Sequence, residues 1–332
     1  MPVLLNSTSQ WVALTQLSPI VWRKAAVMKM AQIRPVVDLW DEDVVDQFNR
    51  DYSVVAASGF SSVISEGENY PTLLNSKGDT MTLSVRKYGK SFSMTEDLVD
   101  GNKYREIEIG MGDLANVIVR GLGLDLTHFL LTFAFSTSYT DRQGNTVTNG
   151  IARASTEAVF ANTHTMDDGS TYDNLNGTLP LNEANLRTGL NLTPSFLDEN
   201  GQKASWGMGQ KVLCTTDDQP NVQNATRLTT QEFALNDANR DINTYRGLFR
   251  HVVLHYGQTS AAGAIDTTVG KYWSVLDMDS MKQNAILATH TRPTLAEPGK
   301  DIHNRSVVWT SKARYDLGIL ASGVGFASNA TT

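Results

Sequence analysis

The chain has 332 residues, of which 41% are hydrophobic and 19% charged, so it can bury a sizeable core and is not an intrinsically disordered protein. Its formal net charge of -7 argues against a protein whose main work is gripping a phosphate backbone, because that work needs a surplus of lysine and arginine on one face. The single cysteine, Cys214, excludes an intrachain disulfide and a thiolate metal cluster, which suits folding in a reducing cytoplasm.

Neither a secretory signal nor a membrane span is expected. The first apolar residues, Val3 to Leu5, are too few for a signal peptide. The longest apolar stretch, Leu122 to Phe135, contains Asp125 and is shorter than the roughly 20 apolar residues that cross a bilayer. We therefore expect a soluble protein with no membrane partner.

The stretch from Met1 to about Asp38 is amphipathic but poorly periodic, and Pro19 and Pro35 are expected to interrupt any long helix in it. Three tryptophans are spaced along this arm and just beyond it: Trp11, Trp22 and Trp40. Exposed tryptophans on a free arm would be a liability, so the arm is expected to pack on a surface. A neighbouring subunit and the chain's own domain are equally good candidates for that surface.

The sequence after Asp41 predicts a mixed segment followed by a long β-hairpin. The run Asn75 to Asp79 is a turn signal, and Thr80 to Val85 beyond it alternates polar and apolar side chains with a period of two. The near strand would carry Glu66 and Glu68. Because its apolar positions are few, the hairpin is expected to need a partner surface.

The strongest periodic signal predicts one long helix from Lys103 to about Phe135. Its apolar residues recur every three or four positions: Ile107, Met111, Leu114, Ile118, Leu122, Leu126, Phe129 and Phe133. At about 1.5 Å per residue such a helix would reach about 50 Å. Four glycines weaken its intrinsic propensity, and close approach of another backbone is the expected reason for them: Gly110, Gly112, Gly121 and Gly123.

The rest of the chain predicts loops, one short helix and scattered strands. Residues 137–178 are expected to form surface loops and short strands, and a second helix is expected over Asn182 to Leu192, capped by Asn182. The strand-like segments are Lys211 to Thr215, Phe249 to Leu254, Lys271 to Leu276, Ser306 to Trp309 and Ala313 to Ile319. This order predicts an α+β fold and not an alternating βαβ fold.

No catalytic, cofactor-binding or metal-ligating residue is predicted. His251 and His255 have a spacing that suits a helical metal site, but Val252, Val253 and Leu254 between them favour a strand. The glycine pairs of the long helix follow no strand and precede no Gly-Lys-Ser or Gly-Lys-Thr, so helix packing is the better explanation. No nucleophile elbow or catalytic triad can be nominated.

Basic residues cluster modestly in the arm, at Arg23, Lys24, Lys29 and Arg34, and in the far strand of the hairpin, at Arg86, Lys87 and Lys90. On an acidic chain such clusters are expected to meet acidic surfaces of neighbouring subunits rather than DNA, and Glu66 and Glu68 offer matching charge. Plain solvated surface is the alternative for each cluster. The candidate contacts between subunits are Glu66, Glu68, Arg86, Lys87, Lys90, Trp11, Trp22, Arg23 and Lys24.

Three stretches and the long helix carry a family resemblance: Glu66 to Pro71, Arg86 to Asp100, and the tail Ala313 to Gly318. In this order they resemble the major capsid proteins of tailed bacteriophages, in particular the Mu-like major head subunit group, with a fold also found in herpesvirus shells. The resemblance implies an N-terminal arm and lead-in over 1–57 and an extended E-loop hairpin over 58–100. It further implies a spine helix with peripheral-domain elements over 101–200, and axial-domain strands returning to the peripheral domain over 201–332.

The function implied by this resemblance is that of a structural head protein, not an enzyme, that self-assembles into an icosahedral shell enclosing double-stranded phage DNA. Its partners would be other copies in hexamers and pentamers, a portal, and a decoration protein as an optional partner. The residues ahead of the hairpin leave no room for a built-in scaffolding segment, so the resemblance implies either a separate scaffolding protein or a sequence that represents the mature form only. The DNA would be held without sequence specificity, and the protein would be found in the virion after assembly in the host bacterial cytoplasm.

Two alternatives come from other classes of protein. A phage tail-tube or other ring-forming structural protein would share the hairpin but should lack a helix of this length. A metal-dependent hydrolase would use His251 and His255.

Overall fold

The computed structural model describes most of the chain. The described residues are 7–55, 64, 69, 77–95, 104–148, 151, 157–166, 168–198, 201–204, 206–207, 209–232, 243–296, 298–301 and 306–330. Glu66 and Glu68 lie outside these residues, and so does the side chain of Trp11.

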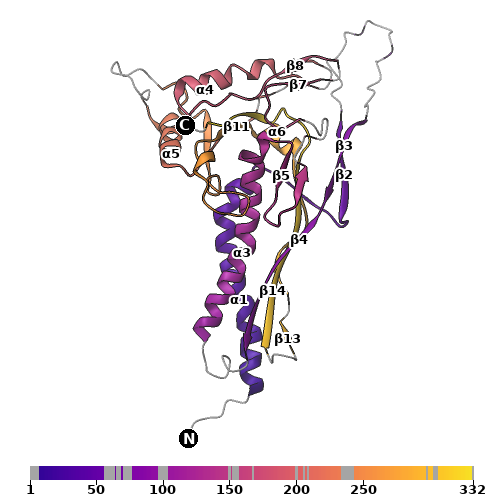
Figure 1. Ribbon diagram of the computed structural model, residues 1–332, viewed down its shortest axis with the longest axis vertical. Helices are drawn as coiled ribbons and strands as arrows, with labels where there is room; N and C mark the ends of the chain where they lie inside the picture. The colour runs from indigo at the N-terminus through magenta and orange to yellow at the C-terminus, as the bar shows by residue number, and fades with distance from the viewer. Residues whose placement is uncertain are drawn as a thin grey trace.

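Two long helices, α1 (Ser7–Val37) and α3 (Tyr104–Leu131), lie side by side along the long axis of the molecule (Figure 1). The predicted long helix is confirmed: α3 has 28 residues, or about 42 Å, and a short 3₁₀ helix η1 (Phe133–Phe135) follows it. The apolar positions that predicted it are buried up to Phe129, namely Ile107, Met111, Leu114, Ile118, Leu122, Leu126 and Phe129.

Helix α1 corrects the prediction that prolines would break the arm, because it runs unbroken through Pro19 and Pro35. An interior proline costs a helix about 3 kcal/mol, so another interaction must stabilise α1. That interaction is packing against α3, which buries a stripe of the helix that includes Trp22, Ala26 and Ile33. From Ser18 onward, where side chains are described, the arm therefore packs on its own domain.

A five-stranded sheet supports the helices. It contains β1 (Asp41–Val44), β4 (Arg86–Thr95), β12 (Ala285–Leu295), β13 (Gly299–Asp301) and β14 (Ser306–Ile319), in the order β1-β12-β14-β13 with β4 also paired to β14. Helix α3 contacts β4 and β14, which pair antiparallel. The two strands predicted at the chain's end are one continuous strand of 14 residues, since residues 310–312 between them keep the ladder with β4.

The predicted hairpin exists, but with a different partner strand. Strand β3 (Lys77–Ser84) confirms the alternating segment, and it pairs with β2 (Asn49–Val55), which lies earlier in the chain than expected. Residues 77–79 already belong to β3, so the predicted turn is wrong at these three positions, while residues 75 and 76 lie outside the described residues. This ribbon packs on the chain's own sheet, because Val54 and Leu83, near its two ends, are buried in a cluster with Ile286.

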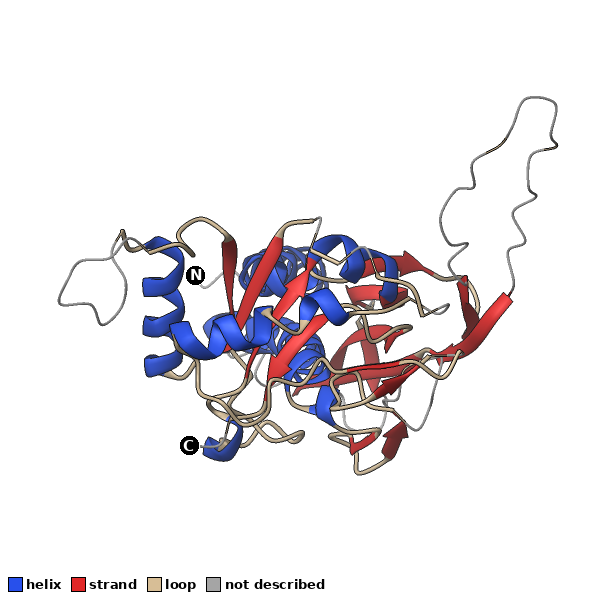
Figure 2. Cartoon of the chain, turned by 90° about the horizontal axis from the view of Figure 1, so that it is seen from above, coloured by secondary structure: helices blue, strands red, loops and turns tan. Residues whose placement is uncertain are grey.

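A second sheet forms the other end of the molecule, with the order β10-β9-β11-β15. Its strands are β9 (Lys211–Thr216), β10 (Phe249–Leu254), β11 (Trp273–Asp277) and β15 (Gly325–Ser328). The first three confirm predicted strands. Helices α4 (Glu183–Leu190), α5 (Gln219–Thr230) and α6 (Met278–Asn284) complete this end (Figure 2). The backbone N–H of Asn185 donates to Asn182 Oδ1 at 2.8 Å, which confirms the predicted cap.

Short hairpins connect the two ends: β5 (Ser138–Thr140) with β6 (Thr146–Thr148), and β7 (His164–Thr165) with β8 (Thr171–Tyr172). Two short 3₁₀ helices, η2 (Thr193–Ser195) and η3 (Thr267–Val269), lie in later loops. These elements confirm the loops and short strands expected over residues 137–178. The molecule is therefore α+β, as predicted.

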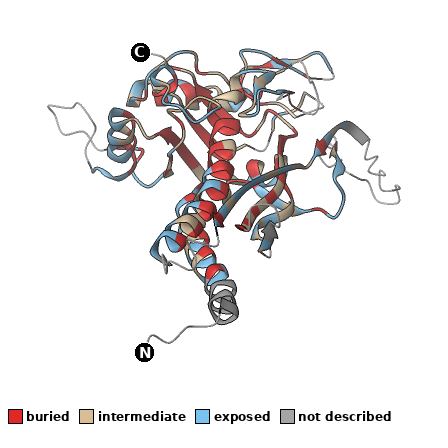
Figure 3. Ribbon diagram, turned by 60° about the horizontal axis from the view of Figure 1, so that its bottom comes forward, coloured by how far each residue is buried: buried red, intermediate tan, exposed pale blue. Residues whose placement is uncertain are grey.

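The core follows α3 through the molecule, as Figure 3 makes visible. By length and composition, residues 105–135 meet the test for a membrane-crossing helix. However, 72% of its apolar stretch of 18 residues is buried inside the chain, as in the core helix of a globular domain.

Three of the four glycines of α3 make room for side chains and not for another backbone, which corrects the prediction. A Cβ built on Gly110 would meet the Phe92 ring, and one on Gly121 would meet the Arg142 guanidinium. At Gly123 it would meet Ile33 and Tyr256, while at Gly112 nothing lies within 4 Å.

This difference predicts opposite effects for two neighbouring substitutions. Gly110→Ala is expected to destabilise the protein by about 1 to 2 kcal/mol, because the Phe92 ring must move. Gly112→Ala is expected to stabilise it by up to about 1 kcal/mol, since alanine favours the helix and meets no neighbour. Urea unfolding of both variants tests this, and an equal shift in both would contradict the packing argument.

Candidate assembly surfaces

A partly buried polar cluster fastens α3 to the sheet. Asp125 Oδ2 accepts hydrogen bonds from Arg142 Nη2 and from the Tyr315 hydroxyl, both at 2.6 Å. The Arg142 guanidinium also lies 4.9 Å from the centre of the Tyr88 ring, which stacks on Tyr315. Gly121, one turn before Asp125, leaves the space that the guanidinium fills. The cluster therefore joins α3, the β5–β6 loop, β4 and β14.

Burial dominates the electrostatics of this cluster. It raises the pKa of the Asp125 carboxyl, and the charge of Arg142 acts against that rise. The pKa of the Tyr88 hydroxyl is also raised, first by burial and then by Asp125. A second ion pair, Arg86 to Asp141 at 3.0 Å, holds the same β5–β6 loop to β4.

His128, one turn after Asp125, is a buried group with a consequence for stability at low pH. Its Nε2 lies 3.0 Å from the Tyr256 carbonyl oxygen and 2.8 Å from Thr259 Oγ1. Burial lowers its pKa from 6.5 to about 4. Between these values the unfolded chain binds a proton that the folded chain does not, so stability is lost as the pH falls through this window.

The loss attributable to His128 is expected to be about 2 to 3 kcal/mol between pH 7 and pH 4. Urea unfolding of the wild type and of His128→Gln across this range measures it, because glutamine does not titrate. The variant should lose less stability on acidification than the wild type. An equal loss would assign the pH dependence to other groups.

The face of the sheet that points away from α3 carries three neighbouring cations. Lys87 on β4 is directly opposite Arg314 on β14, and Lys312 lies two residues before Arg314 on the same face. Like charges directly opposite each other weaken a sheet, so this arrangement is costly for the isolated chain. Arg314 also lies 5.0 Å from the centre of the Phe48 ring, which is 55% exposed. We call Lys87, Lys312 and Arg314 the basic face.

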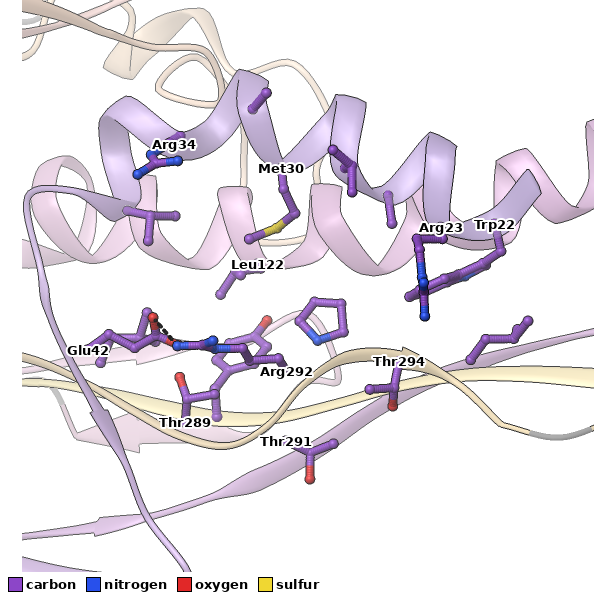
Figure 4. A pocket seen from close by; sticks show the side chains of 18 of the residues that line it. Trp22, Arg23, Met30, Arg34, Glu42, Leu122, Thr289, Thr291, Arg292 and Thr294 are labelled. Carbon is purple, nitrogen blue, oxygen red and sulfur yellow. Dashed lines mark hydrogen bonds and ion pairs between the residues drawn. The ribbon is translucent and has the colours of Figure 1, made fainter. Parts of the chain in front are cut away.

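An apolar groove of about 850 Å³ separates α1 from β12 (Figure 4). Side chains of α1 form one wall, and Thr289 and residues 291–295 of β12 form the other, with Leu122 of α3 between them. From α1 the apolar lining includes Trp22, Val27 and Met30. Val27 is 63% exposed, so the chain alone leaves much of this apolar surface uncovered.

Charged residues at the groove are paired with one exception. Arg292 donates to both carboxylate oxygens of Glu42, at 2.9 and 3.0 Å, and Arg34 lies 3.7 Å from Asp38. Arg23 also lines the groove, and among the described residues it has no ion-pair partner.

The predicted contact residues lie in several separate places. Arg23 and Lys24 are exposed on α1, whereas Trp22 is only 7% exposed inside the chain's own core and offers little surface to a neighbour. The predicted cluster of Arg86, Lys87 and Lys90 does not come together as one patch. Lys87 joins the basic face, while the alternation of the strand turns Arg86 to the opposite side, where it pairs with Asp141.

Lys90 is exposed and shares the side of Arg86 by the same alternation. All three side chains lie on β4, which pairs with β14, and not in the hairpin. A role of any of these residues, or of Glu66, Glu68 and Trp11, in contacts between subunits stays a prediction.

Within the described part of the chain, His251 contributes to the packing of two strands and not to a metal site. His251 lies on strand β10, and its Nε2 is 2.9 Å from Thr215 Oγ1 on the neighbouring strand. Among the described residues, no group of three or more His, Cys, Asp or Glu side chains is placed to hold a metal ion. Cys214 is buried in β9, and burial raises the pKa of its thiol to about 12. No described feature favours a hydrolase.

Sequence reasoning missed the residues that build these surfaces. Arg142 and Tyr315 are far apart in the chain, and they reach Asp125 from two different elements, the β5–β6 loop and strand β14. The interruption of the apolar helix by Asp125 was the one available signal, because a carboxylate on a buried face needs a partner.

Neither the family models nor the curated proteins contain a match to this sequence. Solved structures do match. The chain is similar to the capsid of an empty GTA particle, with a TM-score of 0.51, 9% identity, and coverage of 90% of this chain and 89% of that chain. It is similar to bacteriophage PhiM1 in its mature capsid, with a TM-score of 0.51, 12% identity, and coverage of 90% and 87%. For Gordonia phage Cozz the values are 0.51, 11%, 90% and 86%.

At such low identity the likeness concerns the fold. Nine tenths of the chain follow the fold of these capsid chains, so the predicted tailed-phage major capsid protein fold is confirmed.

Proposed function

We propose that the chain is the major structural protein of an icosahedral phage head that encloses double-stranded DNA, and that it has no catalytic role. The observation that carries the proposal is the fold itself, which follows capsid chains from a GTA particle and from bacteriophage PhiM1 over 90% of this chain. A tail-tube protein was expected to lack a long helix, whereas α3 has 28 residues.

The shape of the chain supports a role in an assembly. Ribbon β2–β3 lies at the margin of the molecule (Figure 1), and the basic face and the groove are surfaces that the isolated chain leaves open. We propose that hexamers and pentamers of this chain form the shell, in the virion, after assembly in the host cytoplasm. The division into arm, E-loop, spine-helix and axial regions belongs to the same proposal.

The basic face is our proposed contact for the acidic segment of a neighbouring subunit. Lys87 and Arg314 repel each other across the ladder, so a carboxylate from outside would relieve a cost present in the isolated chain. Glu66 and Glu68 are the acidic residues that the sequence predicts for this contact. Arg23 and Lys24 on α1 remain candidate contacts of the arm. A separate scaffolding protein and a portal are the further partners we propose, with a decoration protein as an optional one.

Electron microscopy of the purified, concentrated chain tests the function. Shells, tubes or ring-shaped capsomers are the expected result. Size-exclusion chromatography with light scattering should show the same material as a large assembly. A folded chain that stays a compact monomer at high concentration, both alone and with a co-expressed scaffolding protein, would contradict the proposal.

A further inference from the structure

The groove between α1 and β12 is open along its length and is bordered by the edge of a strand. Strand β1 pairs with β12 only from Ile286 to Thr289. Beyond that point, residues 291–295 of β12 line the groove and have β14 on one side, but no strand among the described residues on the other. Pro293 lies in this stretch, as is usual for an edge strand. An edge next to an apolar wall suits an extended peptide.

The length of the groove sets the size of its occupant. Its wall on α1 extends from Pro19 to Val37, a span of about 27 Å for a helix. An extended chain covers this distance with about eight residues. The volume of about 850 Å³ falls within the range of about 300 to 1,000 Å³ of clefts that bury a ligand.

The charges of the groove set the chemistry of its occupant. Glu42 and Asp38 are already paired with Arg292 and Arg34, so these four residues contribute no net charge. Arg23 is the lining cation without an ion-pair partner among the described residues, and in Figure 4 it projects from α1 into the gap. A carboxylate on the occupant would complement it, while apolar side chains would cover Val27 and Met30.

We propose that this groove is a docking site for an extended segment, about eight residues long, of a different protein, carrying apolar side chains at alternate positions and one carboxylate. The site lies on the helix side of the sheet, whereas the basic face lies on the opposite side. It therefore goes beyond the contact between subunits proposed above, and binding at the groove is measurable whether or not shells form.

The test uses the full-length chain and a fluorescein-labelled peptide of eight residues that alternates leucine with serine and has one glutamate. Fluorescence anisotropy should show saturable binding to the wild type. Val27→Asp and Arg23→Glu should each weaken binding by about tenfold or more, because they put charge on the apolar wall or reverse the cation. Lys24→Glu is the matched control: it changes the same charge one residue away, outside the lining, and should leave affinity within about twofold.

Both groove variants alter exposed side chains, so circular dichroism and urea unfolding should match the wild type. No saturable binding, or equal binding by wild type and Val27→Asp, overturns the proposal. A second peptide, residues 61–70 of this chain, distinguishes a second copy as occupant. If it binds the groove more tightly than the designed peptide and Val27→Asp also stops assembly of the chain alone, the groove is an interface between copies and the proposal is wrong.

Discussion

Replacement of Arg142 by methionine is expected to lower the free energy of unfolding by about 3 kcal/mol. The methionine keeps much of the apolar stem but removes the guanidinium that lies 2.6 Å from Asp125. Asp125 would then keep its hydrogen bond from Tyr315 but lose the charge that opposes the effect of burial on its carboxylate. Equilibrium unfolding in urea at pH 7 measures the change.

A double variant separates the ion pair from general packing. Asp125→Asn combined with Arg142→Met removes both charges together, and it should recover part of the stability lost by Arg142→Met alone. If Arg142→Met unfolds within about 0.5 kcal/mol of the wild type, the cluster does not fasten α3 to the sheet.

Trp309→Ala is expected to cost about 4 kcal/mol, the second large effect. Trp309 on β14 is fully buried, its ring stacks 6.0 Å from that of Phe92, and its Nε1 donates a hydrogen bond to Ser18 Oγ at 3.0 Å. The substitution would leave a cavity where α1, β4 and β14 meet. The midpoint of thermal unfolding, read by circular dichroism, should fall clearly.

Two milder variants apportion this loss. Trp309→Phe keeps most of the apolar volume and should cost less than half as much as Trp309→Ala. Ser18→Ala removes only the hydroxyl partner and should cost about 1 kcal/mol. A Trp309→Ala protein as stable as Trp309→Phe would mean that the site collapses around the smaller side chain, and the argument from cavity formation would be wrong.

Local patterns were enough to predict the elements whose own residues define them. The spacing of Ile107, Met111 and Leu114 marks the buried face of α3, and Asn182 caps α4 as its position suggested. The alternation from Thr80 onward located β3 for the same reason. In each case the signal lay within one segment, as a periodicity of side chains or as a capping residue.

The elements that were missed or misplaced depend on contacts with distant segments. Two prolines argue against a helix in α1, and only packing on α3, which the sequence of α1 does not encode, outweighs them. The residues of β3 do not specify whether its partner is the segment just before residue 75 or the earlier β2. The partner and the register depend on the buried face and on the turn, which lie outside β3. The polar cluster at Asp125 and the groove beside α1 arise from such pairings, so neither could be predicted from its residues alone.

Strand β14 gives the molecule a mechanical property. Its 14 residues, from Ser306 to Ile319, run without interruption over about 43 Å and link the cluster that contains Trp309 to the one that contains Ile319. A peptide backbone that is already extended, and paired on both sides over most of its length, resists stretching. A push at one end therefore moves the other end instead of being absorbed by a loop between them. In the shell proposed above, such a subunit would tilt as a stiff plate under pressure from the packed contents, and strain would concentrate at the contacts between neighbours.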